Sequence, residues 1–293
     1  MKVKRQANER HQKLQKSRLP AVLVCILSGL IAFSASASDF ELAKDRVETA
    51  LEAGSPLVVH ATVVLCTNRT KNTDICNENK PRTNLYWGAQ FGVKTYFNRQ
   101  KHWQRLSVPK TSGSGYLERV AFKRAVKVRS GEVDVYLVAD VWRGGDVRKA
   151  TESFLTMSSG ENVEKFKFED RTIYAGGESH VTAYLGHNGL ANFTLDLDLE
   201  KNTLPNSAIV LGRRTSATFT EPLRSTGTFP LLTTKGVVTP EAYILEAAIL
   251  SWFSKVSPVD TLNDTAEVYS KYQKASIAWS RKQFVPGSIA EGG

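Results

Sequence analysis

Apolar runs and helical stripes alternate along this chain after residue 38. Several runs are rich in valine, isoleucine and leucine at consecutive positions, which is typical of strands buried on both faces. Between them lie segments in which apolar residues recur every third or fourth position, and this spacing predicts amphipathic helices. The longer predicted strands are residues 56–66, 132–141, 180–185, 207–211 and 229–234.

The predicted helices are residues 39–53, 84–97, 146–157, 240–255 and 261–282, and shorter strands are expected at 103–108, 117–124 and 165–174. Strands that alternate with helices favour a parallel sheet, because each crossover helix returns the chain to the same end of the sheet. We therefore expect an α/β fold: a three-layer α/β/α sandwich with a mostly parallel central sheet, of the flavodoxin-like kind.

The first 37 residues have the pattern of a secretory signal peptide. A basic head at residues 1–18 precedes an apolar stretch at residues 19–33, and Ala35-Ser36-Ala37 provides the small residues of a cleavage site. We expect cleavage after Ala37 and a periplasmic or secreted mature protein. The alternative is an uncleaved membrane anchor, although the apolar stretch is shorter than the ~20 residues of a spanning helix.

The rest of the chain is long enough to bury a sizeable core, and we assign residues 38–285 to a single α/β domain. Residues 286–293 are predicted to form a disordered tail.

The net charge gives little reason to expect a nucleic-acid partner. The whole chain has a formal charge of +10, but its first 37 residues hold seven cations and one acid and so contribute +6. The predicted mature protein therefore carries about +4, which is ordinary for a soluble domain. Partners are expected to be a small molecule or a protein, with a membrane involved only through an uncleaved anchor.

Two cysteines, Cys66 and Cys76, remain after the predicted cleavage. An exported chain meets an oxidising compartment, which allows a disulfide between these two residues across the polar segment that separates them. The alternative is that Cys66 is a free thiolate at the end of its strand and acts as a nucleophile.

Polar side chains follow several of the predicted strands at the point where each strand ends. The carboxyl ends of parallel strands meet at one edge of the sheet, which is where ligands bind in open α/β folds. The candidate site residues at this edge are Cys66, Asp140, Arg143, His187, Asn188, Arg213, Arg214 and Thr215.

His187 lies between two glycines in a polar turn, and it is either a proton donor or acceptor beside a ligand or a turn residue bonded to local backbone. Asp140 could orient an imidazole or bind a cation, or it could simply pair with Arg143 or accept hydrogen bonds from turn amides. The remaining cations, Arg213 and Arg214, together with Arg143, could clamp an anionic ligand or form a solvated turn. His60, inside an apolar strand, is expected to be a satisfied core residue.

The common nucleotide, metal and serine-hydrolase motifs are missing from the sequence. It has no G-x-x-x-x-G-K-[ST] loop, no G-x-G-x-x-G after a strand and no G-x-S-x-G elbow. The few cysteines and histidines have no zinc-ligand spacing. We therefore expect neither a cofactor nor a metal.

Three segments carry a resemblance to a known group: Asn84-Leu-Tyr-Trp-Gly-Ala, Tyr184-Leu-Gly-His-Asn-Gly-Leu190 and Pro240-Glu-Ala-Tyr. They resemble uncharacterised exported bacterial proteins, in order, over most of residues 57–284. That group in turn resembles the caspase-like (clan CD) cysteine peptidases, in which a His-Gly follows one central strand and the nucleophilic cysteine ends the next. The resemblance implies a caspase-like fold with His187 in the position of the base.

The chain departs from the caspase-like pattern at the nucleophile. The resembled sequence has Ala-Cys-x-Ser after the next strand, whereas Gly212-Arg213-Arg214-Thr215 follows residues 207–211 here. Arg213 thus stands where the cysteine is expected, and Asn188 separates His187 from its glycine. We expect a degenerate, pseudoenzyme-like domain that acts as a binding or structural module. The alternatives are a hydrolase that uses Cys66 with His187, and a periplasmic binding protein for an anionic ligand.

Overall fold

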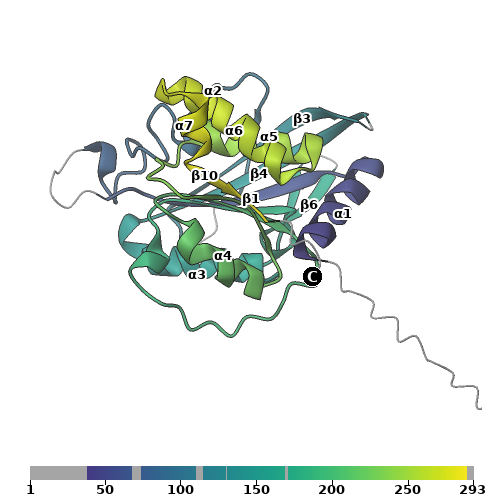
Figure 1. Ribbon diagram of the computed structural model, residues 1–293, viewed down its shortest axis with the longest axis horizontal. Coiled ribbons are helices and arrows are strands. Elements are labelled where there is room, and N and C mark those ends of the chain that lie inside the picture. Colours follow the sequence, from purple (N-terminus) through teal and green to yellow (C-terminus); the bar gives the residue numbers. More distant parts are fainter. Residues whose placement is uncertain (1–37, 68–73, 110–114, 130, 169–170, 289–293) are drawn as a thin grey trace, which may run out of the picture. The chain divides into compact units, whose positions relative to one another are not determined.

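The computed structural model describes residues 38–67, 74–109, 115–129, 131–168 and 171–288. Its centre is an eight-stranded sheet in the order β10-β9-β8-β7-β1-β4-β3-β2 (Figure 1). The strands are β1 (Leu57–Val64), β2 (Gln104–Leu106), β3 (Glu118–Val128), β4 (Gly131–Trp142), β5 (Glu164–Phe168), β6 (Arg171–Ala175), β7 (Val181–Leu185), β8 (Ser207–Leu211), β9 (Phe229–Thr234) and β10 (Phe284–Pro286).

Five neighbouring strands, β4, β1, β7, β8 and β9, run parallel, and β10, β3 and β2 add antiparallel edges. The helices are α1 (Asp39–Glu52), α2 (Val93–Arg99), α3 (Val147–Ser158), α4 (Ser216–Ser225), α5 (Ala242–Lys255), α6 (Pro258–Gln273) and α7 (Ile277–Arg281). The α/β class and the mostly parallel sheet predicted from the sequence are therefore confirmed.

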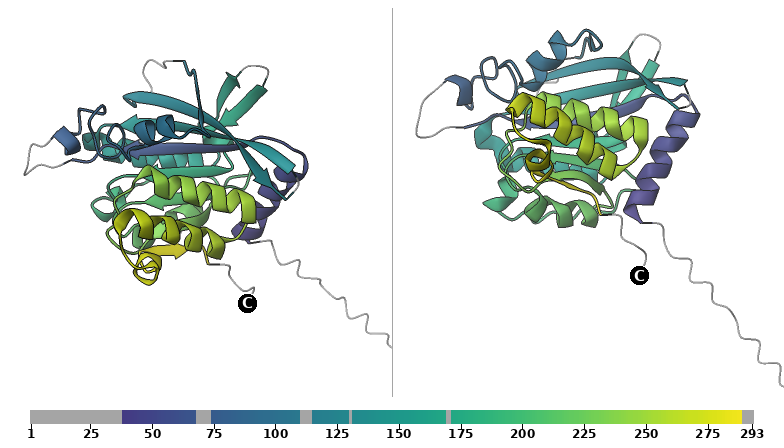
Figure 2. Two further views of the ribbon diagram at one scale, coloured as in Figure 1. Left: turned by 90° about the horizontal axis from the view of Figure 1, so that it is seen from above. Right: turned by 45° about the horizontal axis from the view of Figure 1, so that its top comes forward.

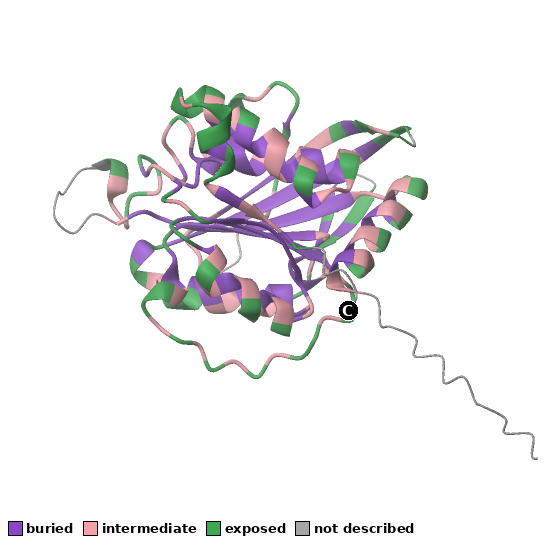
Figure 3. Cartoon of the chain, viewed as in Figure 1, coloured by how far each residue is buried: buried purple, intermediate pink, exposed green. Residues whose placement is uncertain are grey.

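Apolar side chains hold the helices on opposite faces of the sheet (Figures 1 and 3). On one face, α1, α5 and α6 bury Phe40, Trp252 and Tyr269, respectively, in the core against the sheet. On the other face, α3 and α4 bury Phe154 and Phe219 against the ends of the central strands. The helices thus form the outer layers of a three-layer sandwich, because each buries one apolar stripe.

A separate hairpin of β5 and β6 packs on the same face as α3 and α4, towards the β3–β4 side of the sheet (Figure 2). Its apolar residues Phe166, Phe168 and Ile173 are buried against Val58 and Tyr136 of β1 and β4. The short strand predicted at 165–174 is therefore two antiparallel strands.

Two predictions about the end of the chain need correction. The helix expected at 261–282 is divided into α6 and α7, with Lys274 in the left-handed region at φ 52°. The tail predicted at 286–293 begins too early, because Pro286 pairs with Leu232 in the antiparallel β10–β9 ladder. Residues 289–293 and the predicted signal peptide, residues 1–37, lie outside the described residues.

None of the helices in the described residues combines the length and the apolar character needed to cross a bilayer.

His180, just before β7, should make the stability of the fold depend on pH. Its Nδ1 atom accepts a hydrogen bond from the backbone N–H of Val58, 3.2 Å away. Burial, and to a smaller extent the charge of Arg46, lowers the pKa of His180 from 6.5 to about 3. The folded state therefore favours the neutral ring, so its contribution to stability is present above pH 6.5 and is lost as the pH falls towards 3.

We expect the contribution of His180 to the free energy of unfolding, measured by urea titration, to fall by about 2 kcal/mol between pH 7 and pH 5. The His180→Gln variant should lose most of that dependence, because its amide oxygen accepts the same hydrogen bond without titrating. The control His102→Gln changes an exposed turn and should keep the wild-type dependence. Equal pH dependence in wild type and His180→Gln would contradict the assignment.

Candidate functional site

The candidate site lies at the carboxyl edge, which we define as the ends of β4, β1, β7 and β8 with the residues that follow them. In the sheet order β8-β7-β1-β4, the residues after these strands include Arg213, His187, Thr67 and Arg143 in that sequence along the edge. Neighbouring strands lie about 4.8 Å apart, so the four strand ends span roughly 14 Å. The sheet therefore brings His187 and the predicted cations to a single edge.

Close packing of the backbone sets the position of His187. Gly212, after β8, lies so near β7 that a Cβ atom on it would be 2.4 Å from the carbonyl oxygen of Gly186. The backbone N–H of Gly186 donates to the carbonyl of Leu211, which joins the two strand ends. Only glycine fits at position 212 without moving these strands apart, so this pair of glycines fixes where the turn carrying His187 begins.

The imidazole of His187 is exposed but held by the end of β1. Its Nε2 atom accepts a hydrogen bond from the backbone N–H of Thr67 at 3.3 Å, and the Thr67 hydroxyl lies 3.5 Å from the same nitrogen. Since Nε2 accepts, the proton of the neutral ring is on Nδ1. Desolvation by the surrounding protein lowers the pKa of His187 below its usual value. At neutral pH the ring therefore presents an uncharged Nδ1–H donor.

Cys66 is joined to Cys76 in a disulfide. Of the two alternatives for Cys66, the structure therefore has the disulfide. The assignment of Cys66 as a catalytic residue is corrected, because a disulfide sulfur has no thiolate to act as a nucleophile. The hydrolase that would use Cys66 with His187 loses its nucleophile in this state.

A buried amide holds the strand end that carries Cys66. The Asn84 side chain is fully buried; its oxygen accepts from the backbone N–H groups of Cys66 and Tyr86, and its nitrogen donates to the carbonyls of Cys66 and Asn77. The helix predicted at 84–97, with Asn84 as its cap, is therefore wrong for residues 84–92. These residues form successive turns around the amide, and α2 begins only at Val93.

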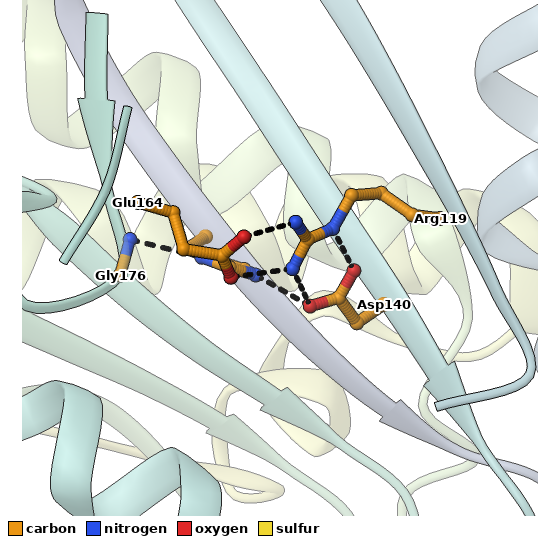
Figure 4. Close-up of polar contacts among 5 residues, drawn as sticks. Arg119, Asp140, Glu164 and Gly176 are labelled. Carbon is orange, nitrogen blue, oxygen red and sulfur yellow. Dashed lines mark hydrogen bonds and ion pairs between the residues drawn. The ribbon is translucent and has the colours of Figure 1, made fainter. Parts of the chain in front are cut away.

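Asp140 does not act on His187, and its predicted pairing with Arg143 is also wrong. One carboxylate oxygen accepts from His60 Nε2 at 2.9 Å and from the Arg119 guanidinium at 2.6 Å, and the other oxygen accepts from Arg119 Nε (Figure 4). Burial alone would raise the pKa of Asp140, but Arg119 and His60 outweigh it and hold the pKa below its usual value. Asp140 thus orients the imidazole of His60 instead of that of His187.

His60 is buried and fully paired, in agreement with its prediction as a satisfied core residue. Its Nδ1 atom accepts a hydrogen bond from the backbone N–H of Gly176 at 2.9 Å. The ring proton is therefore on Nε2, which donates a hydrogen bond to Asp140. Arg119 also binds both oxygens of Glu164, at the start of the β5–β6 hairpin. We call His60, Arg119, Asp140 and Glu164 the buried charge network; it joins the hairpin to the central sheet (Figure 4).

The network includes three groups that could in principle ligate a metal. Ligand atoms of His60, Asp140 and Glu164 lie within 4.8 Å of one another. The Arg119 guanidinium, however, donates to both carboxylates and so already supplies the positive charge between them. A metal ion would have to displace a buried guanidinium, and we therefore assign this cluster a structural role.

Two further residues predicted to bind ligand are occupied by the protein itself. The Asn188 amide nitrogen donates to the carbonyls of Arg213 and Arg214, and its oxygen accepts from Ala191 N and the Thr218 hydroxyl. The Thr215 hydroxyl is buried and bonds to Val210 O and Thr234 Oγ1. Their polar groups are satisfied, so Asn188 and Thr215 shape the turns at the edge and are not free to contact a ligand.

The three arginines predicted for this site are exposed. Among the residues that the structure describes, Arg143, Arg213 and Arg214 have no carboxylate partner within salt-bridge distance. Glu78 lies against Gly145, which brings negative charge to the Arg143 side of the edge. The unpaired positive charge therefore lies chiefly beside His187, at Arg213 and Arg214.

Sequence reasoning missed Thr67, Asn84, Arg119 and Glu164. Thr67 directly follows the candidate Cys66, so its place at the edge could have been predicted from the strand end alone. Arg119 reaches Asp140 through the pairing of β3 with β4, and Glu164 reaches Arg119 through the packing of the hairpin. Neither contact leaves a local signal in the sequence.

No family model matches this chain, and searches of curated proteins and of solved structures found no significant match either.

Proposed function

We propose that this protein is a binding module that recognises an anionic ligand at the carboxyl edge, on the degenerate caspase-like scaffold suggested by the resemblance. The observation that carries the proposal is the pair of exposed arginines without a carboxylate partner among the described residues, Arg213 and Arg214, after β8. The neighbouring strand β7 ends at the turn of His187, whose neutral ring presents an Nδ1–H donor. Arginine forks match the planar oxygens of carboxylates and phosphates, which makes such groups the chemical class we expect.

The same residues argue against hydrolysis by a cysteine at this edge. Cys66 is in a disulfide, and the residue that follows Gly212 is an arginine, whose guanidinium stays protonated and cannot attack a carbonyl. His187 Nε2 is occupied by the backbone N–H of Thr67. These edge residues suit ligand binding better than proton transfer to a nucleophile.

The disulfide supports a second part of the proposal, that the protein works in the periplasm or outside the cell. Cytosolic thiols are normally kept reduced, whereas exported proteins retain disulfides. The basic and apolar pattern of residues 1–37, with Ala35-Ser36-Ala37, fits the same proposal.

The proposal predicts that pyrophosphate and citrate raise the melting temperature of residues 38–293 and bind measurably by isothermal titration calorimetry. Each charge-assisted hydrogen bond is worth about 1.5–3 kcal/mol, so removing one guanidinium should weaken binding roughly tenfold to a hundredfold. We expect this loss in Arg213→Ala and a larger one in Arg213→Ala/Arg214→Ala.

Arg129→Ala is the matched control, because it removes an exposed arginine next to the β3–β4 turn, at the other end of β4. This variant should bind as wild type does. If both anions bind Arg213→Ala/Arg214→Ala as tightly as wild type, the site is wrong; an equal loss in Arg129→Ala would mean that only net charge is being sensed.

A further inference from the structure

A second surface lies on the α3–α4 side of the molecule, where the chain returns from β7 to β8. We call residues 193–200 the strap; Figure 1 shows it as part of the long green loop that passes below α3 and α4. Both of its ends are fixed. Arg148 of α3 donates to the carbonyl of Thr194, and the backbone N–H of Asn202 donates to the carbonyl of Thr226 after α4. The strap thus spans these helices between two anchors.

The strap has the side-chain alternation of a β-strand but lies in no sheet. Its residues are alternately half-buried and exposed, as the changing colours in Figure 3 show. Such a period of two is characteristic of a strand with one apolar face. The half-buried residues are Phe193, Leu195, Leu197 and Leu199, and the exposed residues are Thr194, Asp196, Asp198 and Glu200.

Beyond Thr194, the backbone of the strap makes no hydrogen bonds within the described chain. From residue 195 to residue 201, no backbone N–H or C=O is hydrogen-bonded to any residue that the structure describes. Extended backbone with free donors and acceptors is the template onto which another extended segment can add by strand pairing. The strap therefore offers main-chain hydrogen bonds that nothing in the described chain uses.

The apolar face of the strap does not fill the space beneath it. A cavity of about 640 Å³ lies between the strap and the two helices, and its walls include Leu155, Leu190, Leu197 and Pro222. The three leucines at 195, 197 and 199 only partly cover the apolar cluster of α3 and α4. There is room for apolar side chains of a second segment below the strap.

The charge of the strap indicates which segment would fit. Asp196, Asp198 and Glu200 are exposed and have no basic partner within salt-bridge distance among the described residues, whereas Glu221 at the cavity is paired with Arg224. Opposite charges across paired strands are stabilising and like charges are destabilising. Pairing of two straps from two copies would oppose carboxylates, so the complementary segment is basic.

We propose that the strap binds an extended peptide segment of alternating basic and apolar residues by strand addition. The peptide backbone pairs with the free N–H and C=O groups of the strap, its apolar side chains enter the cavity over α3 and α4, and its basic side chains lie beside Asp196, Asp198 and Glu200. The partner is therefore a protein with an exposed basic strand or tail, and the site is separate from the carboxyl edge.

The test uses a fluorescein-labelled octapeptide of alternating lysine and valine, titrated with residues 38–293 and followed by fluorescence anisotropy. Two versions of the peptide carry N-methyl groups, on the lysine amides in one and on the valine amides in the other. A peptide that adds to one edge uses every second amide. We expect one methylated version to lose binding and the other to keep it, although charge and side chains are unchanged.

The strap variant Asp196→Asn/Asp198→Asn/Glu200→Gln should bind the unmethylated peptide about tenfold more weakly, since each exposed ion pair contributes modestly. Its melting temperature should not change, because these side chains are exposed and unpaired. The matched control neutralises three acids elsewhere, Asp45→Asn/Glu132→Gln/Glu267→Gln, and should bind as wild type does.

Three results would overturn the proposal. Equal binding of both methylated peptides would show attraction by charge alone, and unchanged binding by the strap variant would place the peptide elsewhere. A dimer in analytical ultracentrifugation that the strap substitutions abolish would make a second copy of the chain the occupant instead.

Discussion

Replacing Arg119 with methionine is expected to destabilise the protein by about 3–5 kcal/mol, the largest effect of any single substitution considered for this chain. The Arg119 side chain is 3% exposed and compensates both Asp140 and Glu164. Methionine fills much of the same volume but leaves the buried Asp140 carboxylate with only the hydrogen bond from His60. The free energy of unfolding at pH 7, from urea titration, measures the loss.

The matched control for this substitution is Lys123→Met, on the same strand. Lys123 pairs with Asp134 at 3.0 Å, but both side chains are partly exposed. Such a pair contributes about 0–1 kcal/mol, so this variant should be nearly as stable as wild type. A loss of similar size in both variants would mean that charge burial is not the cause.

The pH dependence of the stability loss distinguishes an unpaired buried charge from a simple packing defect. In wild type, Arg119 and His60 hold the pKa of Asp140 below its usual value, so the network stabilises the fold above that value and loses its contribution as the pH falls through the lowered pKa. Without Arg119, burial dominates and raises the pKa of Asp140, so protonation relieves the unpaired charge. The stability difference should therefore be greatest at pH 7 and shrink in acid; a constant difference would indicate a cavity.

Replacing Asn84 with alanine is expected to destabilise the protein by about 3 kcal/mol and to loosen the strand end beside His187. The substitution removes four hydrogen bonds from a fully buried amide, among them both bonds to the backbone of Cys66. A buried backbone group left unpaired costs about 1–3 kcal/mol, and water that enters the loop would offset part of the total cost of the lost hydrogen bonds. Urea titration gives the stability.

Asn77→Ala is the matched control in the same loop, because it leaves the buried Asn84 amide in place. Within the described residues, the Asn77 side chain accepts from the exposed backbone N–H of Asn79 alone, so its loss should cost less than about 1 kcal/mol. Because Thr67 follows Cys66 and donates to His187 Nε2, Asn84→Ala should also shift the imidazole resonances of His187 in NMR spectra, whereas Asn77→Ala should not. Unshifted resonances in Asn84→Ala would show that the loop holds His187 without this amide.

The strands were the most predictable part of the fold. The bounds predicted for β8 and β9 agree with the structure, because each is an apolar run enclosed by polar or glycine-containing turns. By contrast, the spacing of residues 84–97 predicted a helix where the chain turns. Gly88 and Gly92 approach preceding backbone so closely that a Cβ atom would lie 2.1 Å from Arg82 O and 2.5 Å from Trp87 C. Apolar periodicity cannot reveal such tight turns of the backbone.

The site was predictable in its location and less so in its partners. Strand ends were sufficient to bring His187, Arg213 and Arg143 to one edge. The partners of Asp140 could not be predicted in this way, because they depend on the antiparallel register that places Arg119 directly opposite Asp140 on β3. The strap was also within reach of sequence reasoning, since its alternation of apolar and acidic residues predicts a strand, but the lack of a partner strand is visible only in the fold.

The central place of β1 has a consequence for how the chain folds during synthesis. This strand is the first to emerge, yet it lies between β4 and β7, so its two neighbours are complete only when residues 142 and 185 have been made. Long-range pairing of this kind is slow, because the connecting loops must close before any contact forms. The nascent chain therefore lacks the β1–β7 pairing at the centre of the sheet until more than half of its residues have been made, and until then it can be handled as an extended polypeptide.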